Sequence, residues 1–566
     1  MDEERKLQSI PSRPHILMIV MDDLGSFDLG FHGSGILTPT SDALAKQGIY
    51  LDNYYVLPSC SPTRTALLSG RYPLHTGVHT WIEARSTGGL PLDEETLPQV
   101  LRRANYTAHA VGKWHAGHSS WNQTPTFRGF ESFYGFYLGG QDYYSHLAPW
   151  YLPSATNLYD FRSDLQEYCG ANCSRIVDER GNYSTHIFTR EAINVIKRYS
   201  QSRRQQPLFL YLAFQAVHSP DQVPRYYLNL YDNKNWTMMR KTYAAMLTAA
   251  DEGIANVTKA LQATGLWNNT LVVFTTDNGG PTAACGIQGS LNYPKRGGKC
   301  SVWEGGTTGD GFLSGPALNS TARMVGNRRL VDLFHVVDWL PTLAEMVGVV
   351  PSGKRLDGVS QLTRLRATLN AHPARQEVYI GYAAANGLWY GPSVRHARWK
   401  LVQGASAGPY DPSIPALGGS PQPLVGGMMN STYLLFDLYN DPGENHNVAA
   451  VYPQITNWLM SRLQVYQQTY VYQANNDNAC PFNGTINSSV GLAWYVRNER
   501  DILAEIQHDI LPPCSCVFFA CVSGMSLSCA GFLGATVHLK LLSIHNRKSS
   551  SFVGRQRVLK LWGETT

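Results

Sequence analysis

Three short runs of apolar residues dominate the hydrophobic pattern of this chain. They cover residues 15–21, 208–214 and 271–276. Uninterrupted apolar runs of this length are typical of strands that are buried on both faces, as in a parallel sheet covered by helices. The pattern therefore predicts a sheet whose strands come from distant parts of the sequence.

Between these runs, the apolar positions repeat with the period of a helix. Residues 189–199 and 243–264 each place apolar side chains three and four positions apart, which gives one apolar face. Strands that alternate with such helices are typical of an α/β fold. We expect a large, mostly parallel sheet covered by helices on both faces.

The pattern changes after about residue 365. Short strand-like pieces appear at residues 378–382, 399–402 and 434–438, separated by loops rich in Gly and Pro, and a helical pattern follows at about 452–472. This combination of short strands and a helix indicates a smaller α+β domain. We therefore expect an α/β catalytic domain at residues 14–365, a C-terminal α+β domain at 366–510 and a tail of uncertain nature at 511–566.

Polar side chains follow each of the three buried runs. Asp22 and Asp23 follow the first, His218 lies just after the second, and Asp277 and Asn278 follow the third. Ligands of open α/β sheets bind at the carboxyl ends of the strands, so these side chains are expected to converge. Each one alone is more often a turn former or a cap. Their repetition at three strand ends favours a site, and the three carboxylates and one amide oxygen among them suit Ca²⁺ or Mg²⁺.

Composition narrows the possible functions. Of 566 residues, 43% are hydrophobic and 16% are charged, which indicates a globular protein. The net charge is +5, but Lys and Arg are scattered and form no dense block, so we expect no nucleic-acid partner. The ten cysteines show no spacing typical of a zinc site. Cys169 and Cys173 flank a short loop, and whether they pair stays open.

Glycosylation sequons favour the secretory pathway. They occur at Asn105, Asn122, Asn172, Asn182, Asn235, Asn256, Asn268, Asn319, Asn430, Asn483 and Asn487. Residues 1–13 are polar and charged and contain no apolar signal-peptide core. We therefore expect a leader that is not present in this chain and a lysosomal or secreted protein.

The tail contains one segment long enough to be a membrane anchor. Residues 517–537 carry no formal charge and are followed by Lys540, Arg547 and Lys548. The segment is rich in Ser, Gly and Cys, however, and only weakly apolar. We therefore treat a membrane anchor as the lesser alternative.

The most specific motif is Cys60-Ser61-Pro62-Thr63-Arg64, which continues to Gly70. It resembles the signature of type I sulfatases of the alkaline phosphatase superfamily. Further blocks resemble that family in order: Asp22-Asp23, Gly112-Lys113-Trp114-His115, His218, Asp277-Asn278-Gly279-Gly280, and Lys299 before Trp303-Glu304-Gly305-Gly306. The resemblance covers roughly residues 14–510 and is strongest with the branch that contains N-acetylgalactosamine-4-sulfatase.

The resemblance implies a sulfuric ester hydrolase. In that family, a formylglycine-generating enzyme oxidises the motif cysteine, here Cys60, and the hydrated aldehyde reacts through a covalent sulfo-enzyme intermediate. The implied roles are one calcium ion held by Asp22, Asp23, Asp277 and Asn278, support of the nucleophile by Arg64, sulfate binding by Lys113 and Lys299, a base at His115 and an acid at His218. The implied substrates are aryl sulfates and sulfated sugars, in particular N-acetylgalactosamine 4-sulfate groups of glycosaminoglycans.

The chain departs from the family pattern at several positions. Ser69 stands where the family usually has Thr, and Thr307-Thr308 follow the WEGG block where the family has an Arg. Cys285 and Cys300 lie near the expected site and either pair or stay single.

Two alternative functions stay open. One is a phosphatase or phosphodiesterase of the same superfamily, although such sites usually combine Ser or Thr with two zinc ions. The other is a catalytically silent sulfatase-like binding protein. Such a protein is expected to have lost Cys60, Arg64, Lys113 or a calcium ligand, and none of these is lost.

Overall fold

The computed structural model describes most of residues 13–471 and two short strands beyond them. The gaps before residue 471 are 85, 148–158, 162–174, 203–204, 283–284, 287, 321, 325, 367–371, 386–387 and 404–432. The chain divides into two units, Met1–Val490 and Gly491–Thr566. The sheets and the site described below belong to the first unit.

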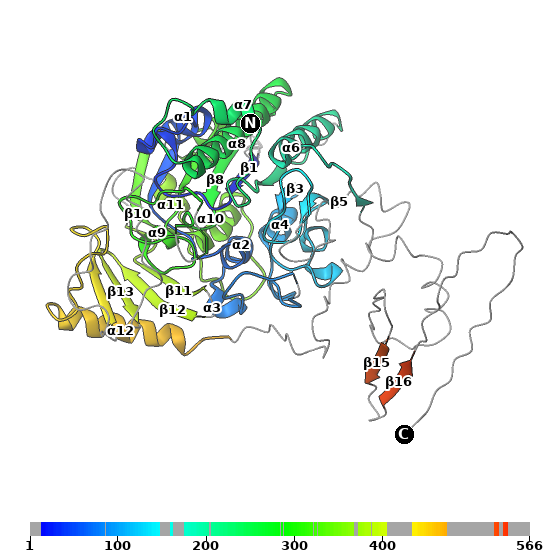
Figure 1. The fold of residues 1–566 in the computed structure, drawn as a ribbon. Helices are drawn as coiled ribbons and strands as arrows, with labels where there is room; N and C mark the ends of the chain where they lie inside the picture. Colours follow the sequence, from blue (N-terminus) through cyan, green and yellow to red (C-terminus); the bar gives the residue numbers. More distant parts are fainter. Residues whose placement is uncertain are drawn as a thin grey trace, which may run out of the picture. The chain divides into compact units, whose positions relative to one another are not determined.

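A ten-stranded mixed sheet forms the centre of the first unit (Figure 1). The three apolar runs form its adjacent central strands, which are parallel to one another. Across the sheet the order is β10 (Arg328–His335), β2 (Ile49–Tyr55), β9 (Gly311–Ser314), β8 (Thr270–Thr276), β1 (His15–Met21), β7 (Leu208–Ala213), β3 (Thr107–Lys113), β4 (Ser132–Phe136), β5 (Tyr159–Phe161) and β6 (Arg175–Ile176). Strand β9 runs antiparallel to both of its neighbours, and β5 is antiparallel to β4 and β6.

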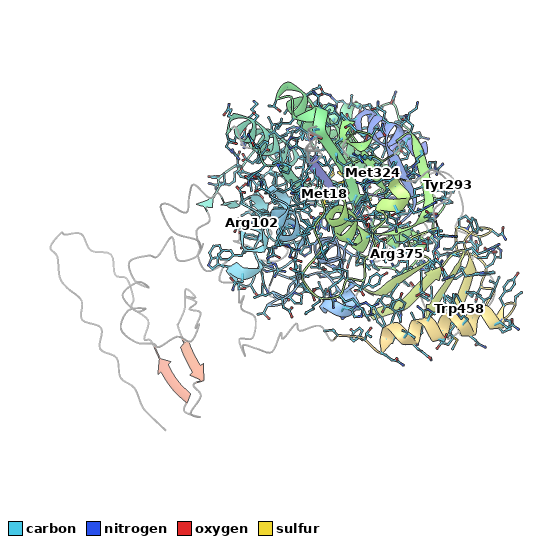
Figure 2. The ribbon with its side chains drawn as sticks, turned by 180° about the vertical axis from the view of Figure 1, so that it is seen from behind. Met18, Arg102, Tyr293, Met324, Arg375 and Trp458 are labelled. Atoms are coloured by element: carbon cyan, nitrogen blue, oxygen red, sulfur yellow. A yellow bond between two sulfur atoms is a disulfide. The ribbon has the colours of Figure 1, made fainter. Side chains whose placement is uncertain are left out.

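Helices cover both faces of this sheet, as the sequence predicts. In β1, Ile16, Met18 and Val20 face one apolar core, whereas the alternate residues face the other. One face carries α1 (Pro39–Gln47), α6 (Ser184–Gln201), α7 (Arg225–Asn229) and α8 (Met238–Ala263). The opposite face carries α2 (Cys60–Ser69), α4 (Leu97–Arg103), α10 (Trp339–Met346) and α11 (Leu362–Arg366). Figure 2 shows Met18 deep among the side chains, and it is fully buried.

Short helical turns lie in the connections between these elements. They are η1 (Gly30–His32), α3 (Pro73–Thr76), η2 (Trp121–Gln123), η3 (Pro125–Arg128), η5 (Leu266–Asn269), α9 (Glu304–Thr307), η6 (Pro316–Leu318) and η7 (Val336–Asp338).

A separate, smaller sheet follows in the C-terminal part of the first unit. Its strands are antiparallel, in the order β11 (Glu377–Ala385), β12 (Leu388–His396), β13 (Trp399–Gln403) and β14 (Tyr433–Asp437). Helix α12 (Pro453–Gln467) packs on this sheet, buries Leu459 and Leu463, and leaves Trp458 at the surface (Figure 2). The predicted combination of short strands and a helix is therefore present, while the boundaries at residues 365 and 510 stay predictions.

The second unit contains one antiparallel pair, β15 (Ser526–Ala530) and β16 (Thr536–Lys540). Most of the candidate membrane segment at 517–537 lies outside the described residues, as do Cys169 and Cys173. No helix within the described part of the chain is long and apolar enough to cross a membrane.

Buried charges join the small sheet to the large one. The Lys400 ammonium on β13 donates to Glu304 at 3.0 Å and lies 2.8 Å from Glu444, and all three side chains are buried. Tyr55 donates to Glu304 at 2.6 Å, and Arg395 donates to the Tyr55 hydroxyl. Burial, together with the nearby Glu304 carboxylate, raises the pKa of Glu444 to about 7. Lys400 therefore pairs with both buried carboxyl groups, and Arg395 lies 3.6 Å from Glu304 as a second cation.

We expect the Lys400→Met substitution to destabilise the protein strongly. Removing one partner of a buried ion pair typically costs about 3–5 kcal/mol, because the remaining charge is left in a low-dielectric environment. Lys259→Met is the control, since Lys259 is an exposed lysine on α8. That substitution should change the free energy of unfolding by about 1 kcal/mol or less. Equal losses for the two variants in urea unfolding would contradict this interpretation.

Candidate active site

The polar residues expected at the strand ends do converge. Asp22 and Asp23 follow β1, Asp277 and Asn278 follow β8, and His218 lies after β7. The Asp23 backbone N–H donates to Asp277 Oδ1 at 3.2 Å, and His218 Nε2 lies 3.7 Å from Asp23 Oδ2. Residues separated by up to 255 positions therefore meet at the carboxyl edge of the sheet.

Two oxygens in this group have no hydrogen-bond donor within the described part of the chain. They are Asp22 Oδ1 and Asn278 Oδ1, and both are buried. A buried oxygen without a partner is costly, and such atoms usually have a role that explains them. With Asp23 and Asp277 they form an oxygen-only set, which is the donor chemistry that Ca²⁺ prefers. These residues therefore fit a hard divalent cation.

A second ligand set is geometrically possible at the same place. Ligand atoms of Asp22, Asp23 and His218 lie within 4.8 Å of one another. A set that contains imidazole suits transition metals better than calcium. We favour the oxygen set, because it accounts for the unpartnered oxygen of Asn278, which the set with His218 leaves unexplained.

Arg64 pairs with one of these carboxylates and lies close to a second. Its Nε and Nη2 both donate to Asp277 Oδ2, at 3.0 and 2.8 Å, and Nη2 lies 3.7 Å from Asp22 Oδ2. Burial opposes the ionisation of Asp277, yet the Arg64 and Lys113 charges hold the pKa of Asp277 below its ordinary value. Burial, followed by the Asp277 charge, instead raises the pKa of Asp22.

Two lysines complete the charge balance. Lys113 Nζ donates to Asp22 Oδ2 at 2.6 Å, and Lys299 Nζ lies 2.7 Å from Asp23 Oδ1. With the pair of Arg64 and Asp277, the site therefore contains three carboxylates and three cations. A divalent cation among them would leave a net positive site, which favours an anionic substrate.

Cys60 is the first residue of α2 and is buried beside these charges. Burial raises the pKa of the Cys60 thiol, although Lys113 and Lys299 oppose the shift. A thiol in such surroundings is mostly protonated and is a weak nucleophile. Ser69, at the last turn of α2, donates to the Thr65 carbonyl at 2.7 Å. The departure from Thr at this position therefore keeps a hydroxyl bonded within the helix.

Two neutral imidazoles flank the site. His115 Nε2 donates to the Ile82 carbonyl at 2.9 Å, which leaves a buried Nδ1 without a partner among the described residues. His218 Nδ1 donates to the Ser219 carbonyl at 2.8 Å, which leaves Nε2 as the acceptor nitrogen. Burial, followed by the Lys113 charge, lowers the pKa of His115. Burial, followed by the Lys299 charge, lowers the pKa of His218 to about 3. Each ring is therefore neutral in the free site and keeps one nitrogen lone pair as an acceptor.

A disulfide holds the loop that carries Lys299. The sequence leaves the pairing of Cys285 and Cys300 open, and the structure joins them with their Cα atoms 6.0 Å apart. The Cys300 N–H donates to the Pro58 carbonyl at 2.7 Å, just before Cys60. The lysine loop and the cysteine helix are thus fixed to each other.

Comparison with known proteins agrees with this arrangement. The family model described as Sulfatase matches residues 14–349. The chain belongs to the sulfatase family. It is 34% identical to mouse arylsulfatase J over 517 residues, which cover 86% of this chain and 81% of the relative. It is 28% identical to mouse N-acetylgalactosamine-6-sulfatase, over 81% of this chain and 86% of that protein.

A solved structure extends the likeness to the fold. Ps i-CgsB in complex with k-i-k-neocarrahexaose superposes with a TM-score of 0.66 at 26% identity, over 88% of this chain and 100% of that one. These relatives are type I sulfatases or sulfatase-fold proteins, and the predicted family is confirmed. The roles of the individual site residues stay proposals.

Glycines allow two sulfatase loops to pack backbone against backbone. A Cβ atom on Gly279 would lie 1.7 Å from the Gly305 carbonyl oxygen, and one on Gly298 would lie 2.3 Å from the Gly280 oxygen. The Gly279 N–H donates to the Gly306 carbonyl at 3.1 Å. The glycine pairs of the two motifs are therefore needed for close approach, rather than for flexibility.

The structure also shows the contacts around the WEGG block, where the family pattern continues to an arginine. Thr308 Oγ donates to the Glu304 carbonyl at 2.6 Å, while the Glu304 carboxylate is paired with Lys400 from the small sheet. Sequence reasoning did not find Lys400, because no local pattern distinguishes it from other lysines on strands.

We expect calcium to stabilise the chelator-treated protein and Asp22→Asn to abolish this effect. A ligand at about 100 times its Kd stabilises the folded state by about 2.7 kcal/mol. The substitution keeps the shape of Asp22 but removes a charged oxygen ligand. Thermal unfolding with and without Ca²⁺ measures the effect, and the exposed residue in Asp93→Asn provides the control. An equal response to calcium in Asp22→Asn and in the unsubstituted protein would contradict the oxygen site.

Proposed function

We propose that this chain is a calcium-dependent sulfatase that hydrolyses sulfate esters of sugars, with Cys60 as the precursor of formylglycine. The observation that carries the proposal is the position of Cys60, buried beside Lys113, Lys299 and an oxygen-only cation site. A protonated, buried thiol is a poor nucleophile in itself. The surrounding charges therefore suit a converted residue better than a free thiol.

The cation and the modified residue supply two distinct properties. Calcium, held by Asp22, Asp23, Asp277 and Asn278, supplies positive charge for the sulfate oxygens. Formylglycine supplies a hydrated aldehyde with two hydroxyls on one carbon, which allows a covalent route and its resolution.

The chain's own side chains bind the substrate and move the protons. Lys113 and Lys299 offset the charge on the sulfate oxygens, and Arg64 keeps the Asp277 carboxylate oriented. His115 accepts a proton at Nδ1, the buried nitrogen that has no other partner among the described residues. His218 delivers a proton to the leaving oxygen from Nε2.

The assignment of His218 as an acid requires that its protonation change during binding. The free site holds this imidazole neutral, because burial lowers its pKa to about 3. An arriving sulfate ester adds negative charge beside the ring and draws Lys299 onto the sulfate, and both changes favour the imidazolium.

We propose N-acetylgalactosamine 4-sulfate groups of glycosaminoglycans as the natural substrate. The resemblance to the 4-sulfatase branch supports this choice, whereas several curated relatives are N-acetylgalactosamine-6-sulfatases. The two positions are distinguished by comparing kcat/KM on 4-sulfated and 6-sulfated N-acetylgalactosamine.

We further propose a lysosomal or secreted destination, and the formylglycine-generating enzyme as a partner during synthesis. Six of the seven described sequon asparagines are exposed, the exception being the half-buried Asn256. The Cys285–Cys300 disulfide is also typical of an oxidising compartment.

The purified protein should release sulfate from a generic aryl sulfate faster than phosphate from the matching aryl phosphate. Cys60→Ala should be inactive, because it removes the precursor of the nucleophile. Mass measurement of the Cys60 peptide from active protein should show the aldehyde in place of the thiol. Faster phosphate release, or a fully active protein with an unmodified thiol, would overturn the proposal in favour of another chemistry.

Cys60→Ser tests the need for a second hydroxyl. A single hydroxyl can attack sulfur, but the resulting ester has no neighbouring group to expel the sulfate. We expect this variant to retain covalent sulfate, visible as added mass on the residue-60 peptide, and to show no steady turnover. Sustained turnover by Cys60→Ser would rule out a required geminal diol.

A further inference from the structure

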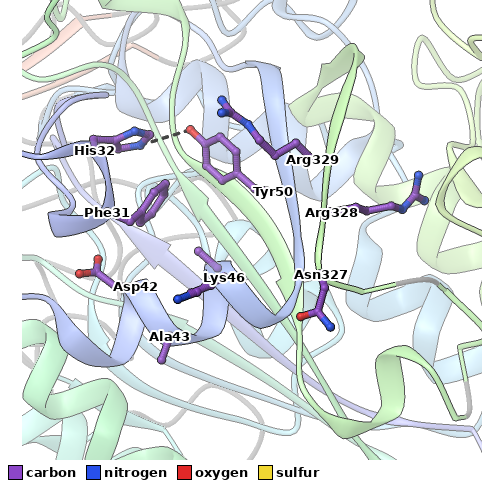
Figure 3. Close-up of a pocket in the computed structure, with 10 residues that line it drawn as sticks. Phe31, His32, Asp42, Ala43, Lys46, Tyr50, Asn327, Arg328 and Arg329 are labelled. Carbon is purple, nitrogen blue, oxygen red and sulfur yellow. Dashed lines mark hydrogen bonds between the residues drawn. The ribbon is translucent and has the colours of Figure 1, made fainter.

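A pocket outside the candidate active site combines aromatic and cationic side chains. It has a volume of about 430 Å³ and lies between η1, α1, the start of β2 and the start of β10. Figure 3 shows Phe31, Tyr50 and Lys46 around its centre, with Arg329 on one side. Pockets of about 300–1,000 Å³ are typical of small-ligand sites.

The aromatic part of the pocket is held in place by a buried carboxylate. Asp310 is fully buried, and its Oδ1 lies 2.8 Å from His32 Nε2 and accepts from the Tyr50 hydroxyl at 2.9 Å. Phe31 packs edge-on against Tyr50 with ring centroids 5.1 Å apart, yet remains 37% exposed. The rings therefore form a fixed apolar surface that is open to solvent.

The charged lining is mainly cationic. Lys46, Arg328 and Arg329 face one carboxylate, Asp42. Arg329 is also paired with Asp52, which lies beside the pocket. Lys46 is exposed and makes no ion pair with any residue that the structure describes. The pocket thus presents at least one available cation next to an aromatic surface.

The pocket and the candidate active site lie near different ends of strand β2. Tyr50 and Tyr55 are five residues apart on β2, or about 17 Å. The Tyr55 hydroxyl contacts Glu304, in the loop region that carries Lys299. None of the residues that line the pocket belongs to the candidate cation site, so a ligand in the pocket does not occupy that site.

We propose that this pocket binds an anionic sugar unit of the polymeric substrate, distant from the ester that reacts. The inference rests on the proposed function. The C–H face of a sugar ring stacks on Phe31, and its sulfate or carboxylate pairs with Lys46. Contact at a second point raises the affinity for a chain without changing the chemistry at the first.

Binding is measured with the Cys60→Ala chain, which does not consume the probe. The probes are a sulfated glycosaminoglycan hexasaccharide and the corresponding sulfated monosaccharide. The binding of each is measured by calorimetry. Adding Lys46→Ala or Phe31→Ala should weaken hexasaccharide binding about three- to tenfold and leave monosaccharide binding unchanged. Lys259→Ala, an exposed lysine on α8 outside the pocket, is the matched control and should have no effect.

A turnover assay separates this inference from the proposed function. In the active chain, Lys46→Ala should leave kcat/KM on an aryl sulfate unchanged and raise KM on the polymer. An unsubstituted chain that does not hydrolyse aryl sulfate would refute the proposed function, while the binding measurement would still test the pocket. Hexasaccharide binding that is equally tight in Lys46→Ala, Phe31→Ala and Lys259→Ala would show that the pocket inference is wrong.

Discussion

The contact between Arg64 and Asp277 is the constraint on which the rest of the site depends. It joins the helix that begins with Cys60 to the end of β8, with both side chains fully buried. A buried pair of this kind is costly to form and more costly to break, so its geometry is restricted. Because Arg64 also lies near Asp22 and donates to the Lys113 carbonyl, the pair fixes the positions of three strand ends and one helix at once.

Much of the catalytic sheet and site could be predicted from sequence, because their signals are local. The run at residues 15–21 is β1 with the same bounds, and the polar residues after β1 and β8 meet as expected. The partners supplied by tertiary packing could not be predicted. Lys400 pairs with Glu304, and Asp310 orients His32 and Tyr50, but neither residue stands in a recognisable motif.

The small C-terminal sheet contributes to the site although none of its residues belongs to a sulfatase motif. Lys400 reaches Glu304, which lies in the same loop region as Lys299. Burial and the Glu304 charge raise the pKa of Glu444 to about 7, so this junction holds a proton that an exposed glutamate would lose. The loop region that carries Lys299 is therefore in contact with the second sheet.

The backbone packing of Gly279 against Gly305 restricts how the specificity of this enzyme can be redesigned. A Cβ on Gly279 would lie 1.7 Å from the Gly305 oxygen, and the Lys299 N–H donates to the Gly280 carbonyl at 3.1 Å. The spacing between Asn278 and Lys299 is therefore set by main-chain contact and not by side-chain choice. Substitutions at these glycines would mostly displace Lys299 rather than change the substrate preference. New substrate preferences should instead arise from loops around the site and from the pocket beside Phe31, where side chains can change without moving the main chain.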